Sequence, residues 1–244
     1  MLVSKFSPAP AQNLLLATLQ AKKYANFLSG LKPLALSINQ VLHEAGGPIK
    51  YVYFPTSGMI SLVGVREDGL KSTELAVVGD YGMVGAPVCL GVVTSGLYEA
   101  VVQLPGTALR AEFDETLELN KNGSPFADLL HGYLRVLIVQ LIRSAICNCF
   151  HRPETRLAKW LLTTGDHAAF EEFPMKQEFI ARMLGARRIA VSHEAKRLQD
   201  EGIISYSRGA MTILKRKRLE KIACPCYRIV RGEIERLRSE GRLR

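Results

Sequence analysis

The sequence predicts an α+β protein in which an antiparallel β-barrel or sandwich is followed by a long helix and then by a basic helical unit with a two-stranded hairpin. Three observations support this prediction. Short apolar runs cut by glycine and turn residues fill residues 38–113, a wide apolar stripe runs through 124–150, and two short amphipathic segments meet at a glycine within 175–201. Apolar periods of two and of 3.6 residues distinguish such strands from helices.

The distribution of charge separates the last third of the chain from the rest. The 244 residues are 48% hydrophobic and 23% charged, as in a folded protein, and carry a formal net charge of +9. Residues 1–150 hold 11 Lys and Arg against 11 Asp and Glu, whereas 151–244 hold 21 against 12. A basic excess that coincides with a folded motif favours a nucleic-acid partner over the alternatives, a solvated surface or a membrane-surface patch.

The N-terminal segment and the cysteines indicate the compartment. The apolar run Leu14–Leu16 is too short for a signal peptide or a membrane span, so we expect a cytoplasmic protein without a membrane partner. The cysteine count is odd and no export signal is visible, which argues against a disulfide framework. We expect reduced thiols at Cys89, Cys147, Cys149, Cys224 and Cys226.

The elements expected in the first half are one helix and several short strands. Residues 11–31 predict an amphipathic helix that ends near Gly30. Glu67-Asp68-Gly69 is typical of a hairpin turn, and strands that recur at regular spacing predict an antiparallel barrel or sandwich. The expected strands are Val41-Leu42, Tyr51–Phe54, Met59–Val65, Thr73–Val78 and Ala100–Leu104.

A long helix is expected over residues 124–150, with Ser124 as its cap and Pro125 in its first turn. Its apolar stripe is too wide for a helix with a single neighbour. We expect it both to cover the barrel and to pair with the same helix of a second copy. The expected dimer positions are Leu130, Leu134, Leu137 and Leu141.

A further amphipathic helix follows His151-Arg152-Pro153, so we place the unit boundary near residue 151. The chain is accordingly divided into three parts. Residues 1–123 form the barrel unit with its N-terminal helix, 124–150 the long helix, and 151–244 the basic unit.

Residues 175–214 give the most informative pattern of the chain. Two short helices are expected over 176–184 and 187–201, with Gly185 breaking the chain between them. Residues 203–214 then alternate around Ser207-Arg208-Gly209, as in a two-stranded wing. Helix, glycine turn and helix followed by a wing predict a winged helix-turn-helix. The expected inward face of the second helix is Val191, Ala195 and Leu198.

The opposite face of the second helix is small, basic and hydrogen-bonding, as suits a helix that enters the major groove. The expected base-reading residues are Arg188, Ile189, Ser192 and His193. The expected DNA-backbone contacts are Lys176, Gln177, Arg187, Lys196, Arg197 and Arg208. Two other interpretations remain, an ordinary surface helix hairpin and a protein-protein module in which the same helices only form a scaffold.

Four stretches resemble the Crp/Fnr family of bacterial transcription regulators: VYFPTSGMISLV, VVGDYGMVGAPVCLG, CNCFHRPETRLAKWLL and QEFIARMLGARRIAVSHEAKRLQDEGIISYSRG. The resemblance covers nearly the whole chain. It implies an N-terminal double-stranded β-helix, the cyclic-nucleotide-binding type of jelly roll, then a long dimerisation helix and a C-terminal winged helix-turn-helix. The implied partners are a two-fold symmetric DNA operator, a second copy of the chain, an unknown small-molecule effector and, for an activator, RNA polymerase.

The recognition helix departs from the family pattern at two positions. In the family this helix commonly carries base-reading residues at the positions that align here with Arg188, Ile189 and His193. Arg188 matches the pattern, Ile189 stands where Glu is common, and His193 replaces the usual Arg. The resemblance therefore implies DNA binding but does not carry over an operator sequence.

The effector region departs further from the family. Members that bind cyclic nucleotides use a Gly-Glu pair for the ribose and an Arg for the phosphate, whereas this chain has Met83 in place of the Glu and no Arg in 94–99. A phosphate buried without a cation is costly, so we expect a pocket without cyclic nucleotide. The degenerate pocket residues are Gly82, Met83, Gly85 and Ser95. A cyclic-nucleotide- or redox-responsive regulator is the alternative.

We expect no metal, no cofactor and no enzymatic activity. Cys147-x-Cys149 and Cys224-x-Cys226 fall in different expected units and match no usual cluster spacing, and residues two apart on a helix point about 200° from each other. A barrel-based metal enzyme, the alternative from another class, needs several converging His and carboxylates, and only His43 lies in that region. The pattern shows no nucleophile-base pair and no phosphate-binding glycine loop.

Overall fold

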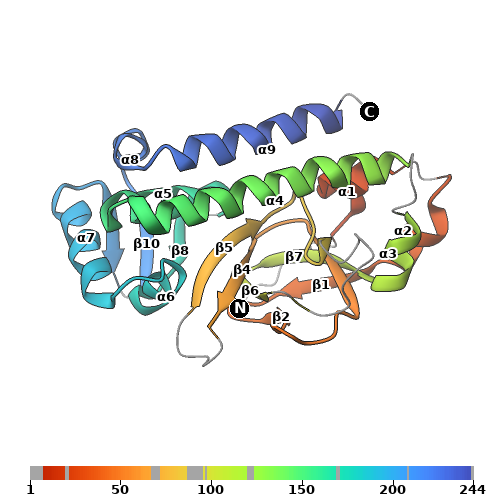
Figure 1. Ribbon diagram of the computed structural model, residues 1–244, viewed down its shortest axis with the longest axis horizontal. Helices are drawn as coiled ribbons and strands as arrows, with labels where there is room; N and C mark the ends of the chain where they lie inside the picture. Colours follow the sequence, from red (N-terminus) through yellow and green to blue (C-terminus); the bar gives the residue numbers. More distant parts are fainter. Residues whose placement is uncertain are drawn as a thin grey trace.

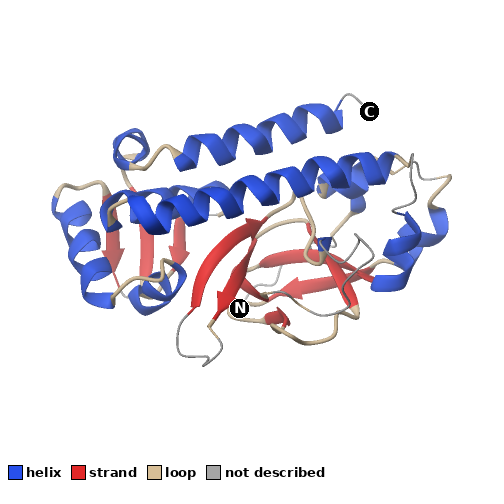
Figure 2. Cartoon of the chain, viewed as in Figure 1, coloured by secondary structure: helices blue, strands red, loops and turns tan. Residues whose placement is uncertain are grey.

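In the computed structural model, a β-barrel and a small winged unit are joined by one long helix, with the C-terminal helix lying beside it (Figure 1). The structure describes residues 8–19, 22–66, 72–86, 96, 98–119, 124–168, 171–207 and 209–242. Figure 2 shows the barrel strands on one side of the long helix and a separate three-stranded sheet at one end of the molecule. The predicted α+β class is confirmed.

The N-terminal segment does not form the single helix predicted for residues 11–31. It forms η1 (Pro10–Gln12), α1 (Leu14–Ala17) and α2 (Ala25–Gly30). Helices α1 and α2 are separate, and a further break precedes α1 at Asn13, which is fully buried. Its side-chain oxygen accepts the Leu15 and Leu16 amide hydrogens, while its amide nitrogen donates to the carbonyls of Pro55 and Gly82 at 2.8 and 2.9 Å. Asn13 therefore caps α1 and anchors it to the barrel.

The barrel consists of two antiparallel sheets, with strand orders β1-β7-β3 and β2-β6-β4-β5. All five predicted strands are confirmed, and the described residues of the barrel form two more, one at residues 32–36, directly after the segment predicted as the N-terminal helix, and one at residues 106–112. The predicted turn at residues 67–69 lies outside the described residues, between the paired strands β4 and β5. The strands are β1 (Lys32–Leu36), β2 (Val41–His43), β3 (Tyr51–Pro55), β4 (Met59–Val65), β5 (Ser72–Val78), β6 (Glu99–Leu104) and β7 (Gly106–Glu112).

After α3 (Phe113–Leu119), the long helix α4 (Pro125–Phe150) begins where the sequence predicts. Ser124 caps it by accepting the Ala127 amide hydrogen at 3.0 Å. The N-terminal half of α4 buries Phe126, Leu130 and Tyr133 in the barrel core. In the C-terminal half the contact with the barrel becomes polar. Gln140 exchanges two hydrogen bonds with the Val77 backbone, and Ser144 donates to the Glu74 carbonyl at 3.0 Å.

The winged unit follows α4 after a break at residues 151–152. Its helices are α5 (Pro153–His167), α6 (Gln177–Met183), α7 (Arg188–Asp200) and α8 (Arg216–Ile222), and its strands are β8 (Glu172–Pro174), β9 (Ile204–Ser207) and β10 (Ala210–Ile213). The two wing strands are confirmed, and β8 adds a third strand that the sequence pattern did not predict. Trp160, Ile180 and Met211 lie in an apolar core that this unit shares with Met59 and Val63 of the barrel strand β4.

The C-terminal helix α9 (Cys226–Arg242) returns along α4 toward the barrel in the opposite direction (Figure 1). Leu237 lies in the barrel core, and a Cβ added at Gly132 of α4 would be 2.9 Å from its Cδ1 atom. Arg135 pairs with Glu233 at 3.0 Å, and Arg238 pairs with Asp80 at 2.6 Å. The last helix of the chain is thus held against α4 and the barrel.

Candidate nucleic-acid interface

The turn between α6 and α7 has the geometry that the sequence predicts. Gly185 has a φ of +56°, in the left-handed region that glycine adopts without steric cost. Its amide donates to the Arg182 carbonyl at 3.1 Å, and the next amide, of Ala186, donates to the Ala181 carbonyl at 3.0 Å. The glycine turn therefore ends α6 and sets the direction of α7.

The two faces of α7 are arranged as predicted. Val191, Ala195 and Leu198 are buried in the core of the winged unit. Arg188, Ile189, His193 and Lys196 are exposed on the other side. Ile189 is 83% exposed, so packing against the described residues does not account for an apolar side chain at this position.

Three of the predicted DNA contacts, Ser192, Gln177 and Arg197, are bonded within the winged unit. Ser192 is half-buried and donates to Gln177 at 2.6 Å, which ties α7 to the start of α6. Arg197 forms ion pairs with Glu154, Glu194 and Glu201. Three carboxylates around one guanidinium neutralise it, which argues against the phosphate contact predicted for Arg197.

The other predicted backbone contacts are exposed cations or lie near the wing. Lys176 is exposed at the N-terminal end of α6, and Arg187 is exposed directly before α7. Arg208 is outside the described residues, between the paired strands β9 and β10. The Gly209 carbonyl accepts the Met175 amide hydrogen at 2.7 Å, which holds the wing beside the start of α6.

The helix-turn-helix also contacts the barrel, through residues that the sequence pattern did not indicate. Arg182 of α6 donates to Ser72 at 2.8 Å and to Glu99 at 2.9 Å. Thr73 of β5 donates to the Met183 carbonyl at 3.2 Å. Polar contacts between residues about a hundred positions apart hold α6 against the barrel edge.

The described part of the expected effector region is closely packed against side chains of the protein. Met83 is 1% exposed, and its carbonyl accepts a hydrogen bond from Tyr133 of α4 at 3.0 Å. A Cβ added at Gly82 would be 2.2 Å from the Tyr133 ring, and Gly85, with a φ of +98°, lies against Val52. Ser95 is outside the described residues. Where Met83, Gly82 and Gly85 meet, the described residues form close core contacts.

The predicted dimer positions do not share one environment. Leu130 and Leu137 are buried in the barrel core and are not available to a second copy of the chain. The prediction of these two residues as dimer positions is therefore wrong. Leu134 is half-buried, and Leu141 is 46% exposed. The exposed apolar side chains instead follow the C-terminal half of α4, at Ile138, Leu141, Ile142, Ala145 and Phe150.

By length and composition alone, α4 could also cross a membrane. One such helix is weak grounds for a span, because a core helix of a soluble protein passes the same criteria. The apolar residues of its N-terminal half are accounted for by the barrel core, and Gln140 and Ser144 of its other half are hydrogen-bonded to β5.

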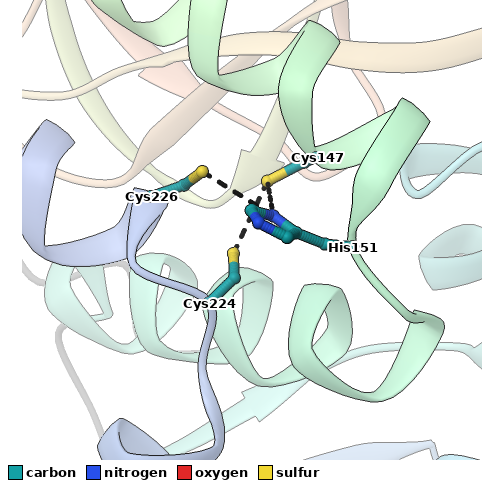
Figure 3. A group of neighbouring side chains, drawn as sticks. All are labelled: Cys147, His151, Cys224 and Cys226. Atoms are coloured by element: carbon teal, nitrogen blue, oxygen red, sulfur yellow. Dashed lines mark hydrogen bonds between the residues drawn. The ribbon is translucent and has the colours of Figure 1, made fainter.

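The two Cys-x-Cys pairs, which the sequence places in different units, lie close together in the structure. Cys147, at the end of α4, lies with its Sγ 3.5 Å from the Sγ of Cys224 and 3.5 Å from Nδ1 of His151, and Cys226 lies 3.8 Å from the same Nδ1 (Figure 3). The expectation that the two Cys-x-Cys pairs lie apart is therefore wrong, because α9 returns to the end of α4. Cys149 is exposed and outside this group, and Cys89 is outside the described residues.

Comparison with known proteins agrees with this architecture. Residues 155–222 match the model of the Crp-like helix-turn-helix domain. Among curated proteins, none matches the chain.

Solved structures with the same fold include several regulators. A putative Crp/Fnr-family regulator from Eubacterium rectale is 18% identical over 85% of this chain and 96% of its own, with a TM-score of 0.65. FixK2 from Bradyrhizobium japonicum is 16% identical over 80% and 98%, with a TM-score of 0.65. TTHA1359 from Thermus thermophilus, a Crp/Fnr-family regulator, is 20% identical over 79% and 98%, with a TM-score of 0.63. The predicted resemblance is confirmed: the chain has the fold of the Crp/Fnr-family transcription regulators and carries a Crp-like helix-turn-helix domain at residues 155–222.

Proposed function

We propose that the protein is a homodimeric transcription regulator that binds double-stranded DNA in a sequence-specific manner, with α7 as the recognition helix. The observation that carries this proposal is the division of α7 into a buried apolar face and an exposed face with Arg188, Ile189 and His193. A helix held by its own core and presenting such side chains to solvent fits the major groove of B-DNA.

Each exposed side chain has a role that follows from its chemistry. Arg188 can donate two hydrogen bonds to guanine O6 and N7, while His193 can donate to or accept from a base edge. Lys176, Arg187 and Lys196 surround these positions as phosphate contacts, which fix the register of the protein on the duplex. Ser192 holds α7 against the start of α6 through its hydrogen bond to Gln177. We keep it as a candidate base contact.

The dimer interface that we propose lies along the C-terminal half of α4. Ile138, Leu141 and Ala145 are exposed and separated by three and four residues, the spacing of a coiled-coil seam. Ile142 widens this stripe. A two-fold axis along the seam relates two copies of α7, whose centres are then about 34 Å apart, one turn of B-DNA.

We also propose that cyclic nucleotides are not the effector. Met83 stands where the family resemblance places the ribose-binding Glu, and it is buried with its carbonyl bonded to Tyr133. In the expected phosphate segment, the described acidic residue Glu99 is paired with Arg182. Calorimetry with cyclic AMP and cyclic GMP at micromolar concentrations is expected to give no binding heat. Saturable binding of either nucleotide would contradict this.

Selection of bound duplexes from a random pool tests the main proposal. We expect the full-length protein to enrich sequences with two symmetric half-sites, and to lose affinity as salt rises because counterions are released from the phosphates. Arg188→Ala is expected to change the enriched sequence, and Lys32→Ala, an exposed cation of β1 on the barrel, serves as the matched control. A pool that stays unenriched, or binding that is insensitive to salt, would contradict the proposal.

A further inference from the structure

Four side chains that can bind a metal ion meet where the end of α4, the winged unit and the start of α9 come together. They are Cys147, His151, Cys224 and Cys226, and Figure 3 shows their sulfur and nitrogen atoms directed toward one common point. The four candidate ligand atoms lie within 4.8 Å of one another. The three cysteines are buried, and His151 is partly buried.

Local structure explains why these residues converge. Cys147 and His151 are four residues apart across the last turn of α4, so their side chains share one face of the helix. The other two cysteines flank Pro225, with Cys224 before α9 and Cys226 as its first residue, so the 200° separation of residues two apart within a helix does not apply to this pair. The Cys224 amide donates to the Thr155 carbonyl of α5 at 3.3 Å, which brings the Cys-Pro-Cys segment to the end of α4.

We propose that Cys147, His151, Cys224 and Cys226 bind one Zn²⁺ ion per chain in a tetrahedral site. Zinc bound to sulfur at about 2.3 Å and to nitrogen at about 2.0 Å requires ligand atoms about 3.5 to 3.8 Å apart in a tetrahedron. Three of the six separations among these atoms are 3.5, 3.5 and 3.8 Å, and all six are within 4.8 Å. An iron-sulfur cluster would have to fit several iron and sulfide ions between the same four atoms, and their spacing leaves room for one ion.

The charges around the group suit a zinc-thiolate site. Zn²⁺ with three thiolates and a neutral imidazole carries one net negative charge. Lys159 of α5 acts electrostatically on all three cysteines, and Arg156 interacts with Cys147 and Cys224. Zinc binding releases the thiol protons to solvent and involves no change of oxidation state, so it needs no co-reactant.

The site supplies all four ligands from the protein and is therefore closed, as in structural rather than catalytic zinc sites. The bound ion links the end of α4 to the segment between α8 and α9. This link crosses the junction between the long helix and the winged unit, so zinc would fix both α9 and the winged unit relative to α4. The proposal does not depend on DNA binding, since a zinc site of this kind would form in the free protein.

Metal analysis of the full-length protein, purified from cells supplied with zinc, tests this inference. We expect about one zinc per chain in the wild type by elemental mass spectrometry. Cys224→Ser and His151→Ala are expected to lower the zinc content several-fold. Cys149→Ser is the matched control, because this exposed thiol lies two residues from Cys147 on α4 and outside the group, and it is expected to retain full zinc content.

A second measurement uses the wild type alone, because a ligand variant can fail to fold. Chelator-treated protein is titrated with Co²⁺, and we expect saturation at one ion per chain with the intense visible bands of tetrahedral cobalt bound to thiolates. Wild-type protein without bound zinc and without these bands would overturn the proposal. So would stoichiometric iron with acid-labile sulfide, or a disulfide between Cys147 and Cys224 in protein purified under reducing conditions.

Discussion

The barrel and the winged unit differ in the exposure of the residues that we expect to be functional. In the barrel, Met83 and Tyr133 are buried, and a Cβ added at Gly82 would be 2.2 Å from the Tyr133 ring, in the segment that we expect to correspond to the family's effector pocket. In the winged unit and the adjoining half of α4, apolar side chains such as Ile189 and Leu141 are exposed. We expect the buried barrel residues to contribute to the stability of the fold, and the exposed residues to contribute to binding of DNA or of a second copy.

This comparison predicts separable effects of substitution. Changes at the closed barrel region are expected to alter the free energy of unfolding, whereas changes at the exposed surfaces alter binding and leave folding intact. A substitution that affected both would break the distinction.

The largest effect is expected for Gly82→Ala. The added Cβ would be 2.2 Å from the Tyr133 ring, inside a buried cluster, so either the helix α4 or the 82–85 segment must shift. Overpacking of this kind costs about 3 kcal/mol of unfolding free energy, measurable as a lower urea midpoint. Gly232→Ala is the control, because nothing lies within 4 Å of its Cβ position in α9, and it is expected to raise stability by about 0.5 kcal/mol. A Gly82→Ala protein as stable as the wild type would show that the region is open.

Leu141→Lys is expected to separate the dimer. The side chain is 46% exposed in the single chain, so folding should be retained while a charge is placed in the proposed seam. Loss of the second recognition helix is expected to weaken binding to a full symmetric site by about 100-fold, with little change for a half-site. Sedimentation of the variant as a dimer would rule out this seam. Leu137→Lys, by contrast, places a charge in the barrel core and is expected to unfold the chain. The two variants therefore distinguish the buried face of α4 from its exposed face.

Glu74 of β5 lies where the two regions meet, and burial raises its pKa to about 7, against a usual value of 4.5. A protonated Glu74 can donate to Ser61, whose oxygen lies 2.8 Å away. Ser61 in turn donates to Gln103 at 2.5 Å, which donates to Thr164 of α5 at 2.9 Å. The neutral carboxyl therefore fits a hydrogen-bond chain between barrel and winged unit.

The sign of the resulting pH dependence follows from proton binding. Between about pH 4.5 and pH 7 the folded state holds a proton at Glu74 that the unfolded state has lost, so stability falls as pH rises through this window. Glu74→Gln stays neutral at all pH values. We expect the variant to be about 2 kcal/mol more stable, relative to wild type, at pH 8 than at pH 4.5. Equal pH profiles in urea unfolding would contradict the raised pKa.

Lys176→Ala is expected to remove one phosphate contact. Affinity should fall for all duplexes alike, and the slope of log affinity against log salt should decrease by about one unit. Lys32→Ala on the barrel should leave that slope unchanged. An unchanged slope in Lys176→Ala would place this lysine away from DNA.

Sequence periodicity predicted those parts of the molecule in which a residue's role depends on its near neighbours. Ser124, Gly185 and the inward face of α7 belong to this class. Contacts between distant positions were not predicted, because no local period records them. Asn13 breaks the expected N-terminal helix by bonding to carbonyls at positions 55 and 82, and Arg182 bonds to Glu99.

The group of Cys147, His151, Cys224 and Cys226 could not be predicted from the spacing of neighbouring residues alone. Cys147 and Cys224 are 77 positions apart, and each Cys-x-Cys pair was considered only by itself. The spacing Cys147-x3-His151 places two ligands on one helical face, and Pro225 prevents the second pair from lying within a helix. Both signals are present in the sequence, but their meeting depends on the path of α9, which periodicity does not give.

The smallest effect is expected at Ile189, where the open surface is apolar. Its side chain is 83% exposed and cannot hydrogen-bond to a base. It can contact the thymine methyl, the one apolar group on the floor of the major groove. We therefore expect each half-site to contain a G read by Arg188 and an adjacent T, and Ile189→Ala to relax the preference at that T by about 1 kcal/mol while the salt slope stays the same.

Replacing that thymine with uracil isolates the methyl group, since the two bases differ only there. Wild type is expected to lose affinity on this replacement, and Ile189→Ala is expected to bind both duplexes equally, because the contact has already been removed. His193→Ala is the matched control on the same face of α7, and it should retain the difference between thymine and uracil. If wild type and Ile189→Ala lose the same affinity with uracil, then Ile189 does not read the methyl and its exposure must serve another contact.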